Sequence, residues 1–207
     1  GEEQMLKNKK DGFISIVALI IMAILIPLLL FLVVDMQYYL QANKKVKSIV
    51  DNVAAAASTT VVPEKLANGI LELDYDKAET YIFEDLASWF NLEDTIYNTN
   101  IDGVKLIKKQ ADKSSLFDTD PLIIRITPNM PQITNTDVLN ASRIEYFIHD
   151  SNGKKTYRFL SGQKVTVSTP TVGVKVSTRT RGVIFRVPIS LKKIGMTEAV
   201  FDSRYTH

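Results

Sequence analysis

The sequence lacks cysteine altogether, which excludes a disulfide framework, thiolate metal sites and cysteine nucleophiles. It has only two histidines, His149 and His207, and they form no His-x-x-x-His pair. A glycine-rich phosphate loop and a Gly-x-Ser-x-Gly nucleophile motif are also missing. Because no set of residues suited to nucleophilic, metal or phosphate chemistry stands out, we expect a protein that is not an enzyme and that carries no cofactor.

The chain also has no large excess of positive or negative charge. The 207-residue chain has 25 lysines and arginines against 23 aspartates and glutamates, a formal net charge of +2, which argues against nucleic acid as a partner. Five carboxylates lie close together, but the glycine-containing loop of an EF-hand is missing, so helix capping and a solvated helix face explain them better than calcium. These residues are Asp74, Asp76, Glu79, Glu84 and Asp85.

Four basic residues fall on neighbouring predicted strands near the C-terminus: Lys175, Arg179, Arg181 and Arg186. They fit a positive strip for an anionic partner. They fit a solvated sheet face or a protected sheet edge equally well, so both interpretations stay open.

The apolar residues are concentrated in one run, residues 13–34, where Ser15 is the only polar side chain. As a helix, this run would be about 33 Å long, enough to cross a hydrocarbon core of ~30 Å. We therefore predict one transmembrane helix. Pro27, near its middle, lacks an amide hydrogen and predicts a kink or a local loosening. Other residues of the predicted membrane anchor are Ile16, Ile20 and Leu25.

The lysines around the apolar run predict its orientation. Lys7, Lys9 and Lys10 stand directly before it, whereas Asp35 follows it and the next basic residue is Lys44. By the positive-inside rule, residues 1–12 form a cytoplasmic leader and the C-terminal part of the chain lies outside the cytoplasm.

A cleaved secretory signal is the main alternative for this segment. Such a signal has an apolar region of about 7–15 residues, followed by a cleavage site with small residues. Here the run is longer, and Asp35 follows it, together with Tyr38 and Tyr39, which suit the headgroup layer of a bilayer. We therefore expect a single-pass protein that stays anchored in a bacterial cell membrane.

Helix-breaking residues are missing from residues 35–58, so we predict that the helix continues outside the membrane, over residues 35–60. This extension closes with four alanines, and small side chains such as Ala54 and Ala55 allow another helix to approach closely. The helix is expected to break before Pro63, where β-branched residues also disfavour it.

Residues 61–207 are predicted to form an α+β domain outside the cytoplasm. Asp76 and Glu79 fit a capping box that opens a helix with one apolar face, ending near Leu92. The only tryptophan, Trp89, lies in this helix, and we expect it in the core.

From about residue 101 onward, apolar and polar residues alternate, which predicts β-strands. The candidate strands are residues 104–107, 122–126, 143–148, 155–160, 164–168, 172–178 and 183–189. Asn152-Gly153 predicts a hairpin between the third and fourth of these runs, and Arg181-Gly182 a turn between the last two. Runs with one apolar and one polar face predict a curved antiparallel sheet that packs on one or two helices, with the long N-terminal helix against it.

The N-terminal region resembles two related groups of proteins. A short basic leader ending in Asp11-Gly12 runs into an apolar helix that starts at Phe13, and this looks like the leader of type IV pilin-like proteins, which a dedicated peptidase cuts after the glycine. The helix exit Val33-Val34-Asp35 and the segment Val50-Asp51-Asn52-Val53 before the alanines are similar to the N-terminal region of TadE/TadG-like proteins, pseudopilins of Tad (Flp) pilus assembly.

The resemblance implies cleavage between Gly12 and Phe13. Pilin-like helices usually carry a glutamate five residues past the cleavage point, and this chain has Val17 there. The residues before Met5 look unlike a leader, and we hypothesise that native translation starts at Met5.

The function that the resemblance implies is that of a structural or accessory component of a Tad or type IV-like pilus or secretion assembly. The implied partners are the lipid bilayer, other pilin-like subunits and a pilus assembly platform with its ATPase. The alternative is a single-pass, membrane-tethered extracellular binding or sensor domain that never enters a filament.

Overall fold

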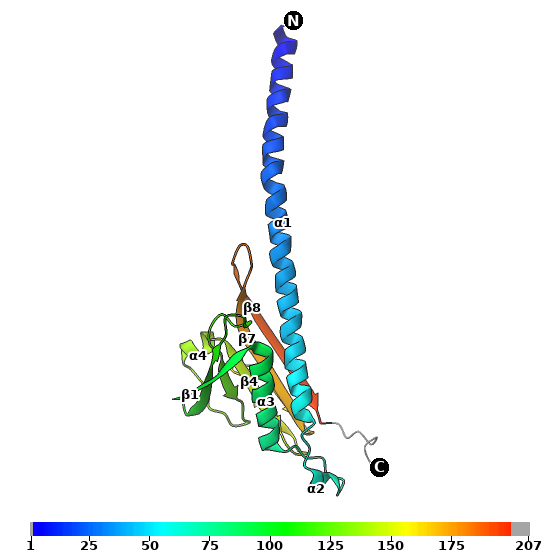
Figure 1. Ribbon diagram of the computed structural model, residues 1–207, viewed down its shortest axis with the longest axis vertical. Coiled ribbons are helices and arrows are strands. Elements are labelled where there is room, and N and C mark those ends of the chain that lie inside the picture. The colour runs from blue at the N-terminus through cyan, green and yellow to red at the C-terminus, as the bar shows by residue number, and fades with distance from the viewer. Residues whose placement is uncertain (1, 200–207) are drawn as a thin grey trace.

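A single helix, α1 (Glu2–Ser58), runs from the N-terminus into a mixed α+β domain at its other end (Figure 1). The computed structural model describes the backbone of residues 2–199 and the side chains of residues 15–199. The other helices are α2 (Pro63–Leu66), α3 (Tyr75–Phe90) and α4 (Thr136–Asn140). The strands are β1 (Leu92–Ile101), β2 (Val104–Ala111), β3 (Leu122–Arg125), β4 (Arg143–His149), β5 (Lys155–Arg158), β6 (Lys164–Val167), β7 (Thr171–Arg181) and β8 (Pro188–Glu198).

The end of α1 lies where β-branched residues were expected to break it. The hydroxyl groups of Ser58, Thr59 and Thr60 donate to the carbonyl oxygens of residues 55, 56 and 57 at 2.7–2.8 Å. The carbonyl oxygens of residues 56 and 57 also accept from the amides of Thr59 and Thr60, at 3.2 and 3.3 Å, so the last carbonyl groups of the helix are hydrogen-bonded where the helix ends. Pro63 then starts the short helix α2, as its fixed φ allows at a first helical position.

Six strands form the main sheet, in the order β1-β2-β3-β4-β7-β8, and β5 and β6 form a separate two-stranded sheet. All neighbouring strands of the main sheet are antiparallel except β3 and β4, which are parallel. The predicted α+β class with a long N-terminal helix is confirmed, and the sheet is mostly rather than wholly antiparallel. The parallel pair needs a crossover connection, which the segment with α4 supplies.

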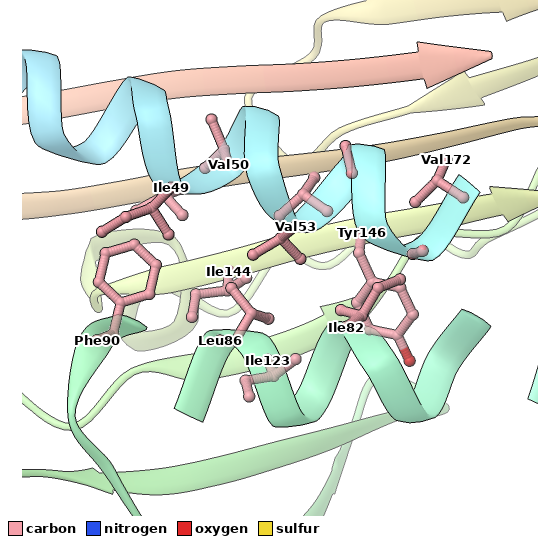
Figure 2. Packing of buried hydrophobic residues seen from close by; sticks show 14 of the residues in the cluster. Ile49, Val50, Val53, Ile82, Leu86, Phe90, Ile123, Ile144, Tyr146 and Val172 are labelled. Atoms are coloured by element: carbon pink, nitrogen blue, oxygen red, sulfur yellow. The ribbon is translucent and has the colours of Figure 1, made fainter. Parts of the chain in front are cut away.

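One face of the main sheet is covered by α1 and α3, which lie side by side on it (Figure 2). Helix α3 contributes residues at every fourth position, and the C-terminal half of α1 contributes a longer stripe, so both helices present an apolar face to the strands. From the sheet, Ile144 and Tyr146 of β4 and Val172 of β7 point into the same core.

The opposite face of the sheet is covered by the β5–β6 sheet and by α4, around a second apolar cluster. Phe147 lies directly over Gly173, its cross-strand partner, and a Cβ at Gly173 would stand 2.3 Å from the ring. The same ring stacks on Tyr157 of β5, with ring centroids 4.3 Å apart. Because both faces of β4 are covered, all seven of its residues are buried.

Helix α3 differs from its prediction at its start and in the place of its tryptophan. Asp74, not Asp76, is the N-cap, and its side chain accepts a hydrogen bond from the Lys77 amide. Trp89 is 48% exposed, so its expected place in the core is wrong. The buried positions of the helix are 78, 82, 86 and 90, and Trp89 is turned by about 100° around the helix axis from its buried neighbour Phe90.

The predicted hairpin at Asn152-Gly153 is also wrong. The two runs that flank this turn belong to different sheets, since β4 pairs with β3 and β7 whereas β5 pairs with β6. Both edges of β4 are therefore occupied. The turn instead carries the chain from the main sheet onto its second face.

Candidate functional site in and around the membrane-anchor helix

The N-terminal half of α1 extends away from the domain, and from residue 15, where the described side chains begin, to residue 34 none of its side chains is buried. Every described side chain from Ser15 to Val34 is exposed, including the predicted anchor residues Ile16, Ile20, Leu25 and Pro27. Among the described residues, this is one helix long and apolar enough to cross a membrane. Pro27 does not interrupt it, because α1 remains helical on both sides of the proline (Figure 1). The predicted cleavage residues Gly12 and Phe13 lie within α1, but their side chains are outside the described set.

The C-terminal half of α1 is part of the core of the domain. Its buried residues are Ala42, Val46, Ile49, Val50, Val53, Ala54 and Ala57, which recur at helical spacing. Ala54 is fully buried in the cluster that also contains α3, whereas Ala55 is exposed on the other side of the helix. The two halves of one helix thus have different surroundings, with the change near Asp35.

Asp35 connects the helix to the loop between β7 and β8. Its Oδ1 accepts a hydrogen bond from the Ile184 amide and its Oδ2 one from the Phe185 amide, both at 2.9 Å. Gly182 allows this approach, since a Cβ there would stand 2.5 Å from Oδ2 of Asp35. The structure therefore joins the first charged residue after the apolar run to a segment 149 residues further along the chain.

This loop was predicted as a strand over residues 183–189. The turn does begin at Gly182, but β8 starts only at Pro188, and residues 182–187 form a loop. The one sequence feature that could have indicated this loop was the apolar run Val183-Ile184-Phe185 between Arg181 and Arg186. An alternating strand explains such a run equally well, so its contact with Asp35 was missed.

Two of the five acidic residues, Asp74 and Glu79, make structural contacts. Asp74 pairs with Lys77 at 2.8 Å, and Oε1 of Glu79 accepts a 2.5 Å hydrogen bond from the Tyr146 hydroxyl. Burial, followed by the neighbouring Glu79 carboxylate, raises the pKa of Tyr146 well above its usual range. Within residues 15–199, no group of His, Asp and Glu side chains is placed to hold a metal ion.

The four basic residues do not form one strip. Arg179, Arg181 and Arg186 are exposed, but Lys175 is buried under the segment after β5. Its Nζ donates to Ser161 Oγ at 2.5 Å and Gln163 Oε1 at 2.9 Å. Burial lowers the pKa of Lys175, and burial raises the pKa of its cross-strand partner Glu145.

A polar groove of about 800 Å³ lies between α4, β3 and β7. Arg143 and Ser177 line it, both nearly buried, and Arg143 Nε and Ser177 Oγ have no hydrogen-bond partner among the described residues. Lys108, Arg179 and Lys192 stand with Asp118 and Asp120 around it, so its charge is mixed. No pattern in the sequence pointed to this groove, because its residues come from distant segments.

Of the two histidines, His149 is buried at the end of β4, and His207 lies outside the described residues. Nδ1 of His149 is 3.3 Å from the Tyr157 hydroxyl. Burial lowers the pKa of His149 below its ordinary value of 6.5, against a smaller opposing effect of the Gly153 backbone. His149 therefore fits a neutral core residue.

Comparisons with models of known protein families, with curated proteins and with solved structures found no significant match to this chain. The functional argument consequently depends on the residues themselves and on the geometry described above.

Proposed function

We propose that this chain is a membrane-anchored, pseudopilin-like surface protein that serves as a structural or accessory component of a Tad or type IV-like pilus or secretion assembly. The observation that carries the proposal is the division of α1. One half is apolar and exposed all round, and the other half is built into a folded domain. An apolar helix of this length requires an apolar environment, which a bilayer or a bundle of like helices supplies.

In this proposal the subunit waits in the membrane and later moves its helix from lipid into a helical bundle. Both environments are apolar, so the exchange itself loses little hydrophobic stabilisation. Release into water would expose some twenty apolar side chains at once, which is why an energy-driven assembly machine would be needed. The α+β domain remains outside the cytoplasm as the interaction surface.

The decisive experiment is mass spectrometry of the mature N-terminus in the protein purified from its native membrane. A chain that begins at Phe13 supports processing by a prepilin peptidase and hence the pseudopilin role. A chain that keeps residues 5–12 contradicts processing after Gly12 and favours the second candidate.

The second candidate is a membrane-tethered binding or sensor domain that never enters a filament. Two observations favour it: Val17 stands where pilin-like helices carry glutamate, and two buried polar atoms at the polar groove, Arg143 Nε and Ser177 Oγ, make no hydrogen bond within the described residues. Crosslinking in intact membranes separates the two functions. A ladder of α1–α1 crosslinks through residues 16–30 indicates a filament, and single products with another protein indicate a sensor.

A further inference from the structure

The loop between β7 and β8 carries an unusual concentration of exposed apolar side chains. Val183 is 58% exposed, Phe185 is 43% exposed, and Ile184 and Val187 are exposed as well. Four large exposed apolar side chains thus lie within one six-residue loop, and such a concentration of exposed apolar surface marks an interaction site. Elsewhere in the domain the large exposed apolar side chains are more scattered, as at Ile70 and Trp89.

The position of the loop indicates what it contacts. Figure 1 shows the β7–β8 hairpin rising beyond the sheet, alongside α1 and toward its N-terminal half. Its tip is held by Asp35, the residue directly after the apolar run. Because helical side chains tilt toward the helix N-terminus, the Asp35 carboxylate and the bound loop lie level with the last turn of the apolar segment.

We propose that the segment Val183–Val187 is a second membrane contact, which inserts its apolar side chains into the lipid interface beside α1. This inference rests on the proposed anchoring of α1 in a bilayer. The apolar run is about 33 Å long against a hydrocarbon core of ~30 Å, so its end and the adjoining loop fall at the boundary with the headgroups. The apolar patch of the loop is thereby continuous with the lipid-facing surface of the helix.

Several backbone amides of the loop already have hydrogen-bond acceptors within the protein, which suits a segment that enters the lipid interface. An amide without a partner is costly in a membrane interface, but Asp35 accepts from the amides of Ile184 and Phe185. The Gly182 amide also donates across the loop to the Val187 carbonyl at 3.3 Å. The amides of Ile184 and Phe185, at the tip, and that of Gly182 therefore already have acceptors when the side chains enter the interface.

The charges beside the loop also favour lipid. Arg181 and Arg186 flank the apolar side chains and are exposed. Long basic side chains extend their charged groups toward headgroups while their stems remain near the acyl chains, and they attract anionic lipids. An apolar tip between two arginines thus matches the order of layers in an anionic bilayer, with apolar groups inside and phosphates outside.

A contact of this kind would set the orientation of the domain. One transmembrane helix leaves a domain free to rotate and tilt relative to the membrane plane. A second contact at the loop, joined rigidly to Asp35, holds the sheet at a defined angle. The domain would then present the same face to its partners at every moment of assembly.

The test uses the full chain in vesicles of phosphatidylcholine and phosphatidylglycerol, with tryptophan as the probe. In a Trp89→Phe background, Phe185→Trp places the only tryptophan in the loop. Ile70→Trp is the matched control, because Ile70 is 51% exposed and its amide donates to the carbonyl of Lys65 in α2, the helix at the far end of the domain (Figure 1). Leu25→Trp reports on the helix itself. We expect the emission of Phe185→Trp to shift to shorter wavelength when the protein is in vesicles, because the indole enters a less polar environment. Lipids brominated near the headgroup should then quench most of this fluorescence, while Ile70→Trp is unaffected by either.

Three outcomes would overturn the inference, each in a different way. If Leu25→Trp is quenched by lipids brominated near the bilayer centre but Phe185→Trp is as open to acrylamide as Ile70→Trp, the loop lies in water and only the helix is anchored. If Phe185→Trp is protected from both acrylamide and lipid quenchers, the loop is covered by protein, such as a second copy. If Leu25→Trp is not quenched either, the anchoring proposal fails together with the inference.

Discussion

Gly195 of β8 lies directly against the backbone of Val50 in α1: a Cβ at Gly195 would stand 2.5 Å from the Val50 carbonyl oxygen. Lys47, one turn earlier on α1, donates to the Ile194 carbonyl at 2.9 Å beside this contact. The helix therefore rests on the edge strand of the sheet at backbone distance. Any side chain larger than hydrogen at position 195 must push the two apart.

We predict that Gly195→Ala destabilises the domain by about 1–3 kcal/mol, the usual cost of forcing extra atoms into a packed contact. Urea unfolding of the full chain in detergent, followed by circular dichroism, measures this loss. Met196→Ala is the control, because Met196 is the adjacent residue and is exposed. Equal stability of Gly195→Ala and the native protein would show that α1 can move away from β8 at no cost.

Asp35→Ala is expected to release the β7–β8 loop from the helix. The amides of Ile184 and Phe185 then lose their acceptors and should exchange hydrogen faster, while the paired amides of β7 and β8 keep their protection. Hydrogen exchange with mass spectrometry resolves the two segments. Asp51→Ala, on the same helix and bound to Lys47, serves as the control and should leave the loop unchanged.

Glu145 holds the segment after β5 to the sheet. The side chain is fully buried, and its Oε1 accepts a 2.6 Å hydrogen bond from the Leu160 amide. Glu145→Leu leaves this amide without a partner and should cost about 1–3 kcal/mol. Glu145→Gln keeps an acceptor oxygen there and should be clearly more stable than Glu145→Leu in urea unfolding. The same loss in both variants would mean that the charge of Glu145, and not its hydrogen bond, matters.

Acidification should destabilise the fold through His149. In the unfolded chain this histidine gains a proton as the pH falls through about 6.5. Burial lowers the pKa of His149 in the folded protein, so protonation there needs a lower pH. The unfolded state binds more protons between the two pKa values, and stability therefore falls as the pH falls through that window.

The variant His149→Gln should flatten this part of the pH dependence, as measured by urea unfolding at a series of pH values. Tyr157 faces the ring, and burial raises its own pKa to about 12, so it does not titrate in this window. Asp150 and Lys155 are the nearby charges, with opposite effects on the histidine pKa. A slope that is unchanged in His149→Gln would assign the acid sensitivity to another group.

A charged residue in the apolar half of α1 should impair filament assembly more than it impairs the insertion of the helix into the membrane. Leu25→Lys costs about 3 kcal/mol of insertion free energy at the centre of a membrane helix, which the remaining apolar residues of the run offset. The variant should therefore stay in the membrane fraction after carbonate washing. A bundle of like helices would have to bury one lysine per subunit, so we expect filaments to be lost. We expect the same loss for Ile16→Lys. Ile70→Lys is the control, and wild-type piliation in Leu25→Lys would contradict the filament role.

Much of the architecture could be predicted from local patterns. The long helix, its end before Pro63 and the position of most strands follow from runs of apolar residues and from the residues that break them. The wrong hairpin has a clear cause, which is that a local pattern predicts a strand but not the strand with which it pairs. Asn152-Gly153 is a good turn between two good strands, yet β4 is already paired on both edges, so β5 joins β6 instead.

The amino-acid sequence by itself determined the apolar run of residues 13–34 and the helix that contains it, because hydrophobicity and the lack of helix breakers act within one segment. Only the tertiary structure decided that half of this helix becomes the core of a sheet domain and that Asp35 binds a loop almost 150 residues away. Such contacts depend on where distant segments meet in space, and that is settled by packing and strand pairing rather than by local preference.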